Sequence, residues 1–206
     1  MTLVIATHNP GKTAEIRGLL KDFSIDIKNI DDFGPIPSVD EDGNTFDENA
    51  YKKASFAARI LGLPALADDS GLIVEALDGA PGIHSARYAG ENATDEQRYL
   101  KLLDDMKGKS NRKAAFECVI SIAMPTGPAL TYEARCEGLI TTEPAGSNGF
   151  GYDPVFFYPP YNKTFAQITG EEKNRIGHRG KALAELKSEF DKVLIWIKQH
   201  MPVQEL

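Results

Sequence analysis

The stretch Leu66-Ala67-Asp68-Asp69-Ser70-Gly71-Leu72-Ile73-Val74-Glu75 decides how the rest of the chain is interpreted. Two adjacent carboxylates, Asp68 and Asp69, stand between short apolar runs and are followed at once by a hydroxyl and a glycine. Apolar runs on both sides indicate a buried strand, where two anions need compensation by a metal ion, a Lys or Arg, or a proton. The alternative is a β-turn, because Asp-Asp-Ser-Gly is also ordinary turn chemistry, and this segment alone favours the turn.

Composition predicts a globular protein with one domain, or one domain with two lobes around a cleft. The chain has 206 residues, of which 42% are hydrophobic and 26% charged, and this length suffices for a sizeable core. No apolar run approaches the roughly 18 residues that a membrane helix needs, so we expect no membrane partner. A net charge of −7 argues against general nucleic-acid binding but is compatible with a small phosphorylated ligand in a locally basic cleft.

The first residues and the cysteines indicate in which cellular compartment the protein is expected to reside. Residues 3–6 read directly as a strand, without the basic and apolar regions of a signal peptide. The two cysteines, Cys118 and Cys136, lie in strand-like runs and lack metal-ligand spacing. We therefore expect a reduced, cytoplasmic protein, and a disulfide between neighbouring strands is the less favoured alternative.

A strand, a tight polar turn and a helix follow one another at the start of the chain. Residues 2–7 read as a strand, and Thr7-His8-Asn9-Pro10-Gly11-Lys12 leads into a helix that runs to about Leu20. Asn9 suits the N-cap and Pro10 the first helical position. Free N–H groups, the positive helix end and Lys12 would form an anion site. A plain helix cap is the alternative, since the Walker A spacing is absent.

An acidic loop separates the second predicted strand, residues 24–30, from the second predicted helix. The helix should run from about Phe46 to Leu61 behind a capping box of Thr45 and Glu48. Most acids of the loop should be solvated, but the cluster 40–42 precedes a helix that returns to the sheet edge. One of these carboxylates could therefore lie near Asp68 and Asp69. Mg²⁺ typically takes one or two protein carboxylates and completes its shell with phosphate oxygens and water.

The C-terminal half predicts two more helices and a hairpin. A capping box of Thr94 and Gln97 opens a helix that ends near Met106, and the last helix should span residues 181–199. Strands 114–124 and 129–140 read as a hairpin, which is a candidate for a second lobe or a subunit interface.

Two glycine-rich segments, 79–88 and 143–154, interrupt these elements. In the first, Arg87 either helps to hold the carboxylates or is a surface residue. In the second, Gly149 and Gly151 flank Phe150 and let the backbone approach a ligand closely. An aromatic residue in such a loop is more often a loop anchor than a base-stacking platform.

Four segments, taken together, resemble the inosine triphosphate pyrophosphatase family, whose members act on non-standard purine nucleoside triphosphates. They are residues 7–12, 67–71, 149–154 and 178–179, and matches at 46–50 and 79–87 extend the resemblance over nearly the whole chain. It implies an α/β fold with a mixed, twisted central sheet flanked by helices and two lobes around a nucleotide-binding cleft. It also implies Mg²⁺-dependent hydrolysis of ITP, dITP, XTP or dXTP to the monophosphate and pyrophosphate, which removes deaminated purines from the nucleotide pool, and a homodimer.

The same resemblance assigns the site residues. Asp69 would be the proton acceptor and a metal ligand, Glu41 the second metal carboxylate, and Ser70 a donor to a phosphate oxygen. Asp68 would bind metal, hold Lys12 or orient Asp69. The triphosphate would lie on a loop made of Thr7, His8, Asn9, Pro10, Gly11 and Lys12. The base would contact Phe150, Gly151, Tyr152, Asp153, Lys173, His178 and Arg179.

Within the base site, Phe150 would stack on the purine and Tyr152 with Asp153 would complete that wall. Lys173, His178 and Arg179 would donate to the 6-keto oxygen, which adenine replaces with an amino group. Gly177 departs from the Ser that often precedes this His-Arg pair, which could cost one hydrogen bond. Two other hypotheses stay open: a Maf-like pyrophosphatase with another base preference, and a non-catalytic nucleotide-binding protein.

Overall fold

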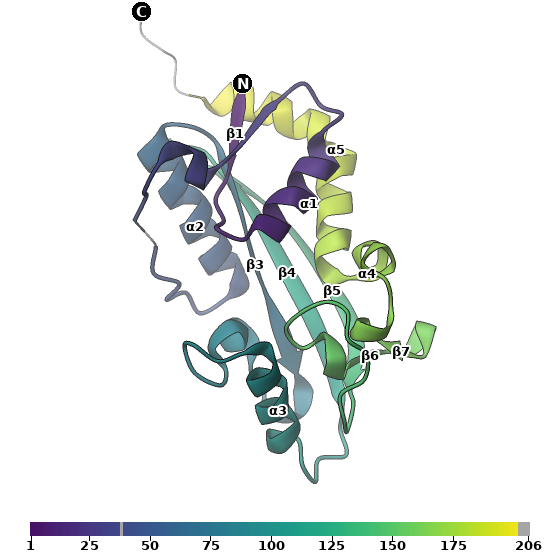
Figure 1. Ribbon diagram of the computed structural model, residues 1–206. Coiled ribbons are helices and arrows are strands. Elements are labelled where there is room, and N and C mark those ends of the chain that lie inside the picture. Colours follow the sequence, from purple (N-terminus) through teal and green to yellow (C-terminus); the bar gives the residue numbers. More distant parts are fainter. Residues whose placement is uncertain (38, 202–206) are drawn as a thin grey trace, which may run out of the picture. The chain divides into compact units, whose positions relative to one another are not determined.

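The computed structural model describes residues 1–37 and 39–201 (Figure 1). Short 3-10 turns connect several elements, and two of them, Ile30–Phe33 and Gly82–Arg87, contribute to the sites below. The strands and helices, in chain order, are β1 (Thr2–Ile5), α1 (Pro10–Leu20), β2 (Asp26–Asn29), α2 (Phe46–Leu61), β3 (Ala65–Val74), α3 (Asp95–Asp105), β4 (Lys113–Ala123), β5 (Ala129–Ile140), β6 (Phe156–Tyr158), β7 (Lys163–Thr164), α4 (Gly170–Ile176) and α5 (His178–His200).

The strands of the described residues form a seven-stranded sheet in the order β2-β1-β3-β4-β5-β6-β7. β1 pairs in parallel with β2 and β3, whereas β6 pairs antiparallel with β5 and β7. The sheet is therefore mixed, as predicted. A turn joins the neighbouring strands β4 and β5, and in it the N–H of Met124 donates to the carbonyl of Pro128 at 2.8 Å. This confirms the predicted hairpin.

The strand order reverses at β1, which has β2 on one side and β3 on the other. Right-handed crossovers that leave in opposite directions place their helices on opposite faces of a sheet. Figure 1 shows α2 on one side of these strands and α1 on the other. The small side chains of α2, among them Ala54, Ala57 and Ala58, pack against β1 and β3 in a buried cluster. Sheets of this kind bind ligands at such a reversal, beyond the carboxyl ends of the strands.

The chain separates into two compact units. The first comprises Met1–Asp69, Val119–Glu133 and the chain from Ala182 onward, and the second comprises Ser70–Cys118 and Ala134–Lys181. The core of the first unit includes the alanine face of α2 and the apolar stripe of α5. The core of the second is aromatic, with the rings of Phe116, Phe156 and Phe165 packed on one another.

Local signals at helix starts are confirmed with one exception. α1 begins at Pro10 behind the Asn9 cap, and the capping box of α3 is present. The predicted box of α2 is half formed: the hydroxyl of Thr45 accepts from the N–H of Glu48 at 3.1 Å. The carboxylate of Glu48 accepts instead from the N–H of Asn44, at 2.6 Å. The cap therefore extends one residue further back than expected.

Two other predictions differ from the structure. Residues 66–74 belong to the continuous strand β3, so the turn interpretation of Asp-Asp-Ser-Gly is wrong. α5 begins at His178 instead of Lys181, directly after the unpredicted short helix α4.

The structure bears on the predictions for the two cysteines and for membrane-spanning helices. Cys118 and Cys136 are both buried, and the structure joins them by no disulfide bond. None of the helices in residues 1–37 and 39–201 has the length and hydropathy that a bilayer crossing requires.

Candidate active site

The loop after β1 and the two adjacent carboxylates of β3 meet because the two strands are parallel. Ile5 is in register with Leu66, and the N–H of Ala6 donates to the carbonyl of Leu66 at 2.7 Å. Two residues further along this register, Thr7 on one side corresponds to Asp68 on the other. The strand order thus brings the predicted anion loop beside the predicted catalytic carboxylates within the first unit.

The two carboxylates have different partners. Successive side chains of a strand point to opposite faces of the sheet, and α1 and α2 lie on opposite faces. Asp68 Oδ2 lies 2.8 Å from Lys12 Nζ in α1, and Asp69 Oδ1 lies 2.9 Å from Lys53 Nζ in α2. Both carboxylates are buried, with 3% and 12% of their side chains exposed. Of the three roles considered for Asp68, the structure shows the pairing with Lys12.

Lys53 is a site residue that the sequence interpretation missed. Its ammonium lies between two carboxylates, 2.9 Å from Asp69 Oδ1 and 3.2 Å from Glu41 Oε1. A signal was present, because Lys53 follows Ala50 by three residues and stands beside Ala54 on the buried stripe of α2. A lysine at that position must place its charge against an acid, so it was a candidate partner for the buried carboxylates.

The pKa directions describe a cluster with more negative than positive charge. Burial raises the pKa of Asp69, the charge of Lys53 and its hydrogen bond lower it, and Glu41 raises it. Burial alone would lower the pKa of Lys53, but the charges of Asp69, Glu41 and Asp68 together raise it. Burial is thus the main reason why the pKa of Asp69 rises, whereas the surrounding carboxylates raise the pKa of Lys53. Lys53 is thus held protonated, and Asp69 is more basic than an exposed aspartate.

A cavity of about 190 Å³ opens at this place in the first unit. It contains both lysines and two of the acids discussed above, together with apolar side chains. Its lining consists of Ala6, Thr7, His8, Lys12, Ile30, Pro37, Val39, Glu41, Lys53, Phe56 and Asp68.

The structure shows how the two predicted metal ligands, Glu41 and Asp69, are arranged. No group of three or more His, Cys, Asp or Glu within the described part of the chain is arranged to hold a metal ion. Glu41 and Asp69 nevertheless converge on one positive charge, the ammonium of Lys53. Two carboxylates are as many as Mg²⁺ takes where a phosphorylated substrate completes its shell. The two predicted ligands are therefore brought together, in a form that fits a metal shared with substrate.

The predicted base-binding residues belong to the second unit, where Lys173 and Asp153 contact Phe150. Phe150 is 57% exposed, and Lys173 Nζ lies over its ring, 4.4 Å from the centroid. The same ammonium pairs with the carboxylate of Asp153. Burial raises the pKa of Asp153, against the charge and hydrogen bond of Lys173 and the hydrogen bond from the N–H of Phe150. One face of the Phe150 ring therefore lies against a fixed positive charge.

Two aspartates hold the turn that carries Phe150 by accepting hydrogen bonds from its backbone N–H groups. Asp153 accepts from the N–H of Phe150 at 3.0 Å, and a Cβ at Gly149, where φ is +77°, would lie 2.0 Å from Asp153 Oδ2. Asp95, at the first position of α3, accepts from the N–H of Gly151 at 2.7 Å and was also missed by the sequence interpretation. Glycine is required at position 149 both by its φ and by the adjacent carboxylate.

Tyr152 and Asp153 are almost entirely buried. The hydroxyl of Tyr152 donates to the carbonyl of Ser85 at 2.8 Å. The family resemblance assigns these two side chains to the wall of the base site, and the structure places both in the interior of the second unit. They fix the turn from within the core.

His178 and Arg179 open α5. The imidazole of His178 is buried and stacks on Phe116, with 4.8 Å between ring centroids, and Arg179 is half-buried. At Gly177, an added Cβ would lie 2.7 Å from the carbonyl oxygen of Lys173. The glycine that departs from the family pattern therefore fits a tight junction between α4 and α5.

Ser70 directly follows Asp69 in β3, where the second unit begins, and Arg87 ends the 3-10 turn Gly82–Arg87 of that unit. Asp68 and Asp69 belong to the first unit.

Comparison with known proteins places these residues in a family context. Residues 3–189 match the model of the Ham1 family. A dITP/XTP pyrophosphatase of Desulfotalea psychrophila is 58% identical over 97% of this chain and 89% of its own length. A dITP/XTP pyrophosphatase of Syntrophobacter fumaroxidans is 60% identical over 95% of this chain and 84% of its own.

Solved structures agree with the fold. A HAM1 protein from Coxiella burnetii superimposes with a TM-score of 0.90 at 44% identity, covering 93% of this chain and 99% of that one. The Ham1 protein of Staphylococcus aureus gives a TM-score of 0.88 at 40% identity, covering 94% of this chain and 100% of that one.

Proposed function

The chain belongs to the Ham1 family, and we propose that it hydrolyses deaminated purine nucleoside triphosphates. The substrates would be dITP, ITP, XTP and dXTP, and the products the monophosphate and pyrophosphate. Two relatives with 58% and 60% identity over nearly the whole chain are dITP/XTP pyrophosphatases, which supports this substrate class. The activity would remove deaminated purines from the nucleotide pool.

One observation carries the proposal: an anion-binding loop and a buried carboxylate cluster meet at the carboxyl end of β1. The loop leads to Lys12, in the first turn of α1, which lines a 190 Å³ cavity, where its ammonium can bind phosphate oxygens. Beside it, Asp69 shares Lys53 with Glu41. Phosphoryl chemistry needs this combination of positive charge for the phosphates and a base for water.

We propose that Mg²⁺ binds to Glu41 and Asp69 together with the substrate phosphates. The cluster formed by Lys12, Lys53, Asp68, Asp69 and Glu41 has two positive and three negative groups, so it is net negative. A triphosphate would enter such a site only with additional positive charge. When bound, a divalent cation would neutralise phosphate oxygens and acidify a water molecule.

In the reaction, Asp69 accepts the proton of the attacking water. The water oxygen forms a bond to phosphorus, the bond between the α phosphorus and the oxygen that bridges to the β phosphorus breaks, and pyrophosphate leaves. Burial raises the pKa of Asp69, which makes it a better proton acceptor than an exposed aspartate. Lys12 and Lys53 stabilise the negative charge that grows on the departing phosphates.

Base selection is assigned to the second unit. Phe150 stacks on the purine, and Lys173 with His178 and Arg179 donates to the 6-keto oxygen of hypoxanthine or xanthine. The exposure of Phe150 and the fixed ammonium of Lys173 over one face of its ring support this role. Adenine presents an amino group at that position, so donor would face donor, and such a site can reject the wrong substituent by about 10⁴-fold.

The family resemblance also leads us to propose one domain of two lobes that acts as a homodimer without a nucleic-acid partner. Sedimentation of the full chain would test the dimer. A monomer at the concentrations of the activity assay would contradict it.

Asp69→Asn tests the catalytic assignment. The amide keeps the size of the side chain but cannot accept a proton, so pyrophosphate release from ITP should fall by about 10²–10⁴-fold. Asp42→Asn is the matched control, because Asp42 neighbours Glu41 but pairs with the exposed Lys52, and it should retain full turnover. Near-normal turnover of a folded Asp69→Asn variant would contradict the assignment.

A further inference from the structure

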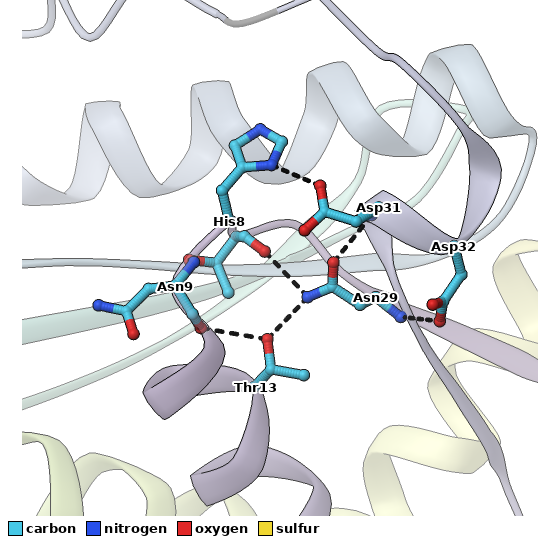
Figure 2. Close-up of polar contacts among 7 residues, drawn as sticks. His8, Asn9, Thr13, Asn29, Asp31 and Asp32 are labelled. Atoms are coloured by element: carbon cyan, nitrogen blue, oxygen red, sulfur yellow. Dashed lines mark hydrogen bonds and ion pairs between the residues drawn. The ribbon is translucent and has the colours of Figure 1, made fainter.

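Asn29, the last residue of β2, is a buried polar residue to which the proposed chemistry gives no role. It is only 7% exposed, and its amide makes the hydrogen bonds drawn in Figure 2. Nδ2 donates to the carbonyl of Thr7 at 2.9 Å and to the hydroxyl of Thr13 at 2.7 Å. Oδ1 accepts from the N–H of Asp31 at 2.8 Å. One amide therefore connects the end of β2 to the loop after β1.

The chemistry of these partners fixes the orientation of the loop peptide. A carbonyl only accepts and an N–H only donates, so Nδ2 must face Thr7 and Oδ1 must face Asp31. The peptide between Thr7 and His8 is trans, and in a trans peptide the N–H points opposite to the carbonyl. Because the carbonyl of Thr7 is turned toward Asn29, the N–H of His8 is turned away from it. Asp31 also pairs with His8, at 2.6 Å (Figure 2).

The same amide also reaches the other end of the loop. The hydroxyl of Thr13, which accepts from Asn29, donates to the carbonyl of Asn9 at 3.2 Å. The side chain of Asn9 in turn accepts from the N–H groups of Gly11 and Lys12, at 2.9 Å and 3.3 Å. Both ends of the loop are thus tied, directly or through one hydroxyl, to Asn29.

We propose that Asn29 is a positioning residue for phosphate binding. It holds the peptide between Thr7 and His8 so that this part of the cavity lining presents an N–H group, not a carbonyl oxygen, to the triphosphate. The inference rests on the proposed function, in which this loop binds the phosphates. A peptide released from Asn29 is free to turn its carbonyl toward the anion, and a carbonyl oxygen repels a phosphate that an N–H would bind.

Three variants separate positioning from stability. Asn29→Ala removes the whole amide, and Asn29→Asp keeps its size and the acceptor for Asp31 but loses the donor to Thr7. Asp32→Ala is the matched control, because Asp32 accepts from the backbone N–H of Asn29 at 2.8 Å and pairs with Arg17, so it supports the same turn through residues outside the loop. Unfolding midpoints define a temperature at which all variants are folded.

The measured quantities are the dissociation constant of inorganic tripolyphosphate with Mg²⁺, by calorimetry, and KM and kcat for ITP. Both Asn29 variants should weaken tripolyphosphate binding by about tenfold and raise KM by a similar factor, with kcat within about threefold. That pattern is expected when an interaction supports substrate and transition state equally. Asp32→Ala should change tripolyphosphate binding by less than about twofold.

Unchanged tripolyphosphate binding in folded Asn29→Asp would overturn the inference. So would an equal loss in Asp32→Ala, because the effect would then come from the stability of the turn. Failure of the wild-type chain to release pyrophosphate from ITP would overturn the proposed function instead, while tripolyphosphate binding would still test Asn29.

Discussion

Lys53→Met removes the positive charge on which the site is built and keeps most of the side-chain volume. The ammonium of Lys53 is 14% exposed and lies between Asp69, which is 12% exposed, and Glu41, which is 39% exposed. Removing one partner of a buried ion pair costs about 3–5 kcal/mol. Glu41 can turn toward solvent, where ion pairs contribute little, so the penalty falls mainly on Asp69. We expect a loss of about 3 kcal/mol at about pH 8 in EDTA, at the lower end of that range.

The loss should depend on pH in a definite direction. Burial already raises the pKa of Asp69, and Lys53 lowers it, so the variant has a still higher pKa in the folded state. The folded variant then binds more protons than the unfolded chain between the unfolded pKa, about 3.9, and the raised pKa. Its free energy of unfolding therefore falls as pH rises through that window. The difference from wild type should shrink at acid pH and be complete above the raised pKa.

The same variant tests the metal proposal without an activity measurement. With Lys53 gone, Glu41 and Asp69 face each other without a cation, so Mg²⁺ should stabilise the variant more than the wild type. A ligand at a hundred times its dissociation constant adds about 2.7 kcal/mol, which would restore most of the loss. An equal effect of Mg²⁺ on both proteins would contradict the assignment of these two carboxylates.

Urea unfolding at about pH 5 and about pH 8, in EDTA and in Mg²⁺, measures all three quantities. A loss of about 3 kcal/mol corresponds to a fall of roughly 6–12 °C in Tm for a chain of this size. Lys52→Met is the matched control, because the neighbouring Lys52 pairs with the exposed Asp42, and its midpoint should not change. A Lys53→Met variant as stable as the wild type at both pH values would refute the buried cluster.

Three further predictions concern the second unit and its junction with α5. Lys173→Met leaves the buried carboxylate of Asp153 without its ammonium and should lower the free energy of unfolding in urea by about 3 kcal/mol. Lys192→Met, which breaks an exposed pair, is the control, and an equally small loss in both variants would contradict this. Gly180→Ala should destabilise the chain by about 1–3 kcal/mol, because the new Cβ would lie 1.5 Å from the carbonyl oxygen of Asn174, whereas Gly170→Ala meets open space and should not. Arg179→Ala should lower the preference for ITP over ATP, measured as the ratio of kcat/KM values; an unchanged ratio would exclude Arg179 from base selection.

Signals that act over one helical turn were visible in the sequence. Asn9 with Pro10 and Thr94 with Gln97 were correctly interpreted as helix starts, because a cap is a contact between residues two or three positions apart. The same signal was present at Thr169 and Glu172, which form a capping box at the start of α4.

The turn interpretation of Asp-Asp-Ser-Gly failed for a different reason. Turn propensity is local, but the strand is stabilised by distant residues: Lys12 and Lys53 compensate the carboxylates from two helices on opposite faces. From the sequence alone, a metal ion, a basic side chain or a proton could each compensate the charge of the two carboxylates. Only the order β2-β1-β3 brings these lysines to the strand.

Positioning residues were the hardest to predict. Asn29 contacts Thr7 across 22 residues, and Asp95 contacts Gly151 across 56. Neither spacing has a motif, because each contact depends on which strand or turn lies next to which. Catalytic and base-contacting candidates were accessible through family resemblance, whereas the residues that hold them were not.

The most direct test of the central claim is pyrophosphate release from ITP, XTP, GTP, ATP and CTP, each with Mg²⁺ and with EDTA. The account predicts metal-dependent turnover that is concentrated on ITP and XTP, with pyrophosphate and not orthophosphate as the product. Turnover that favours ATP or CTP, or that persists in EDTA, would contradict it.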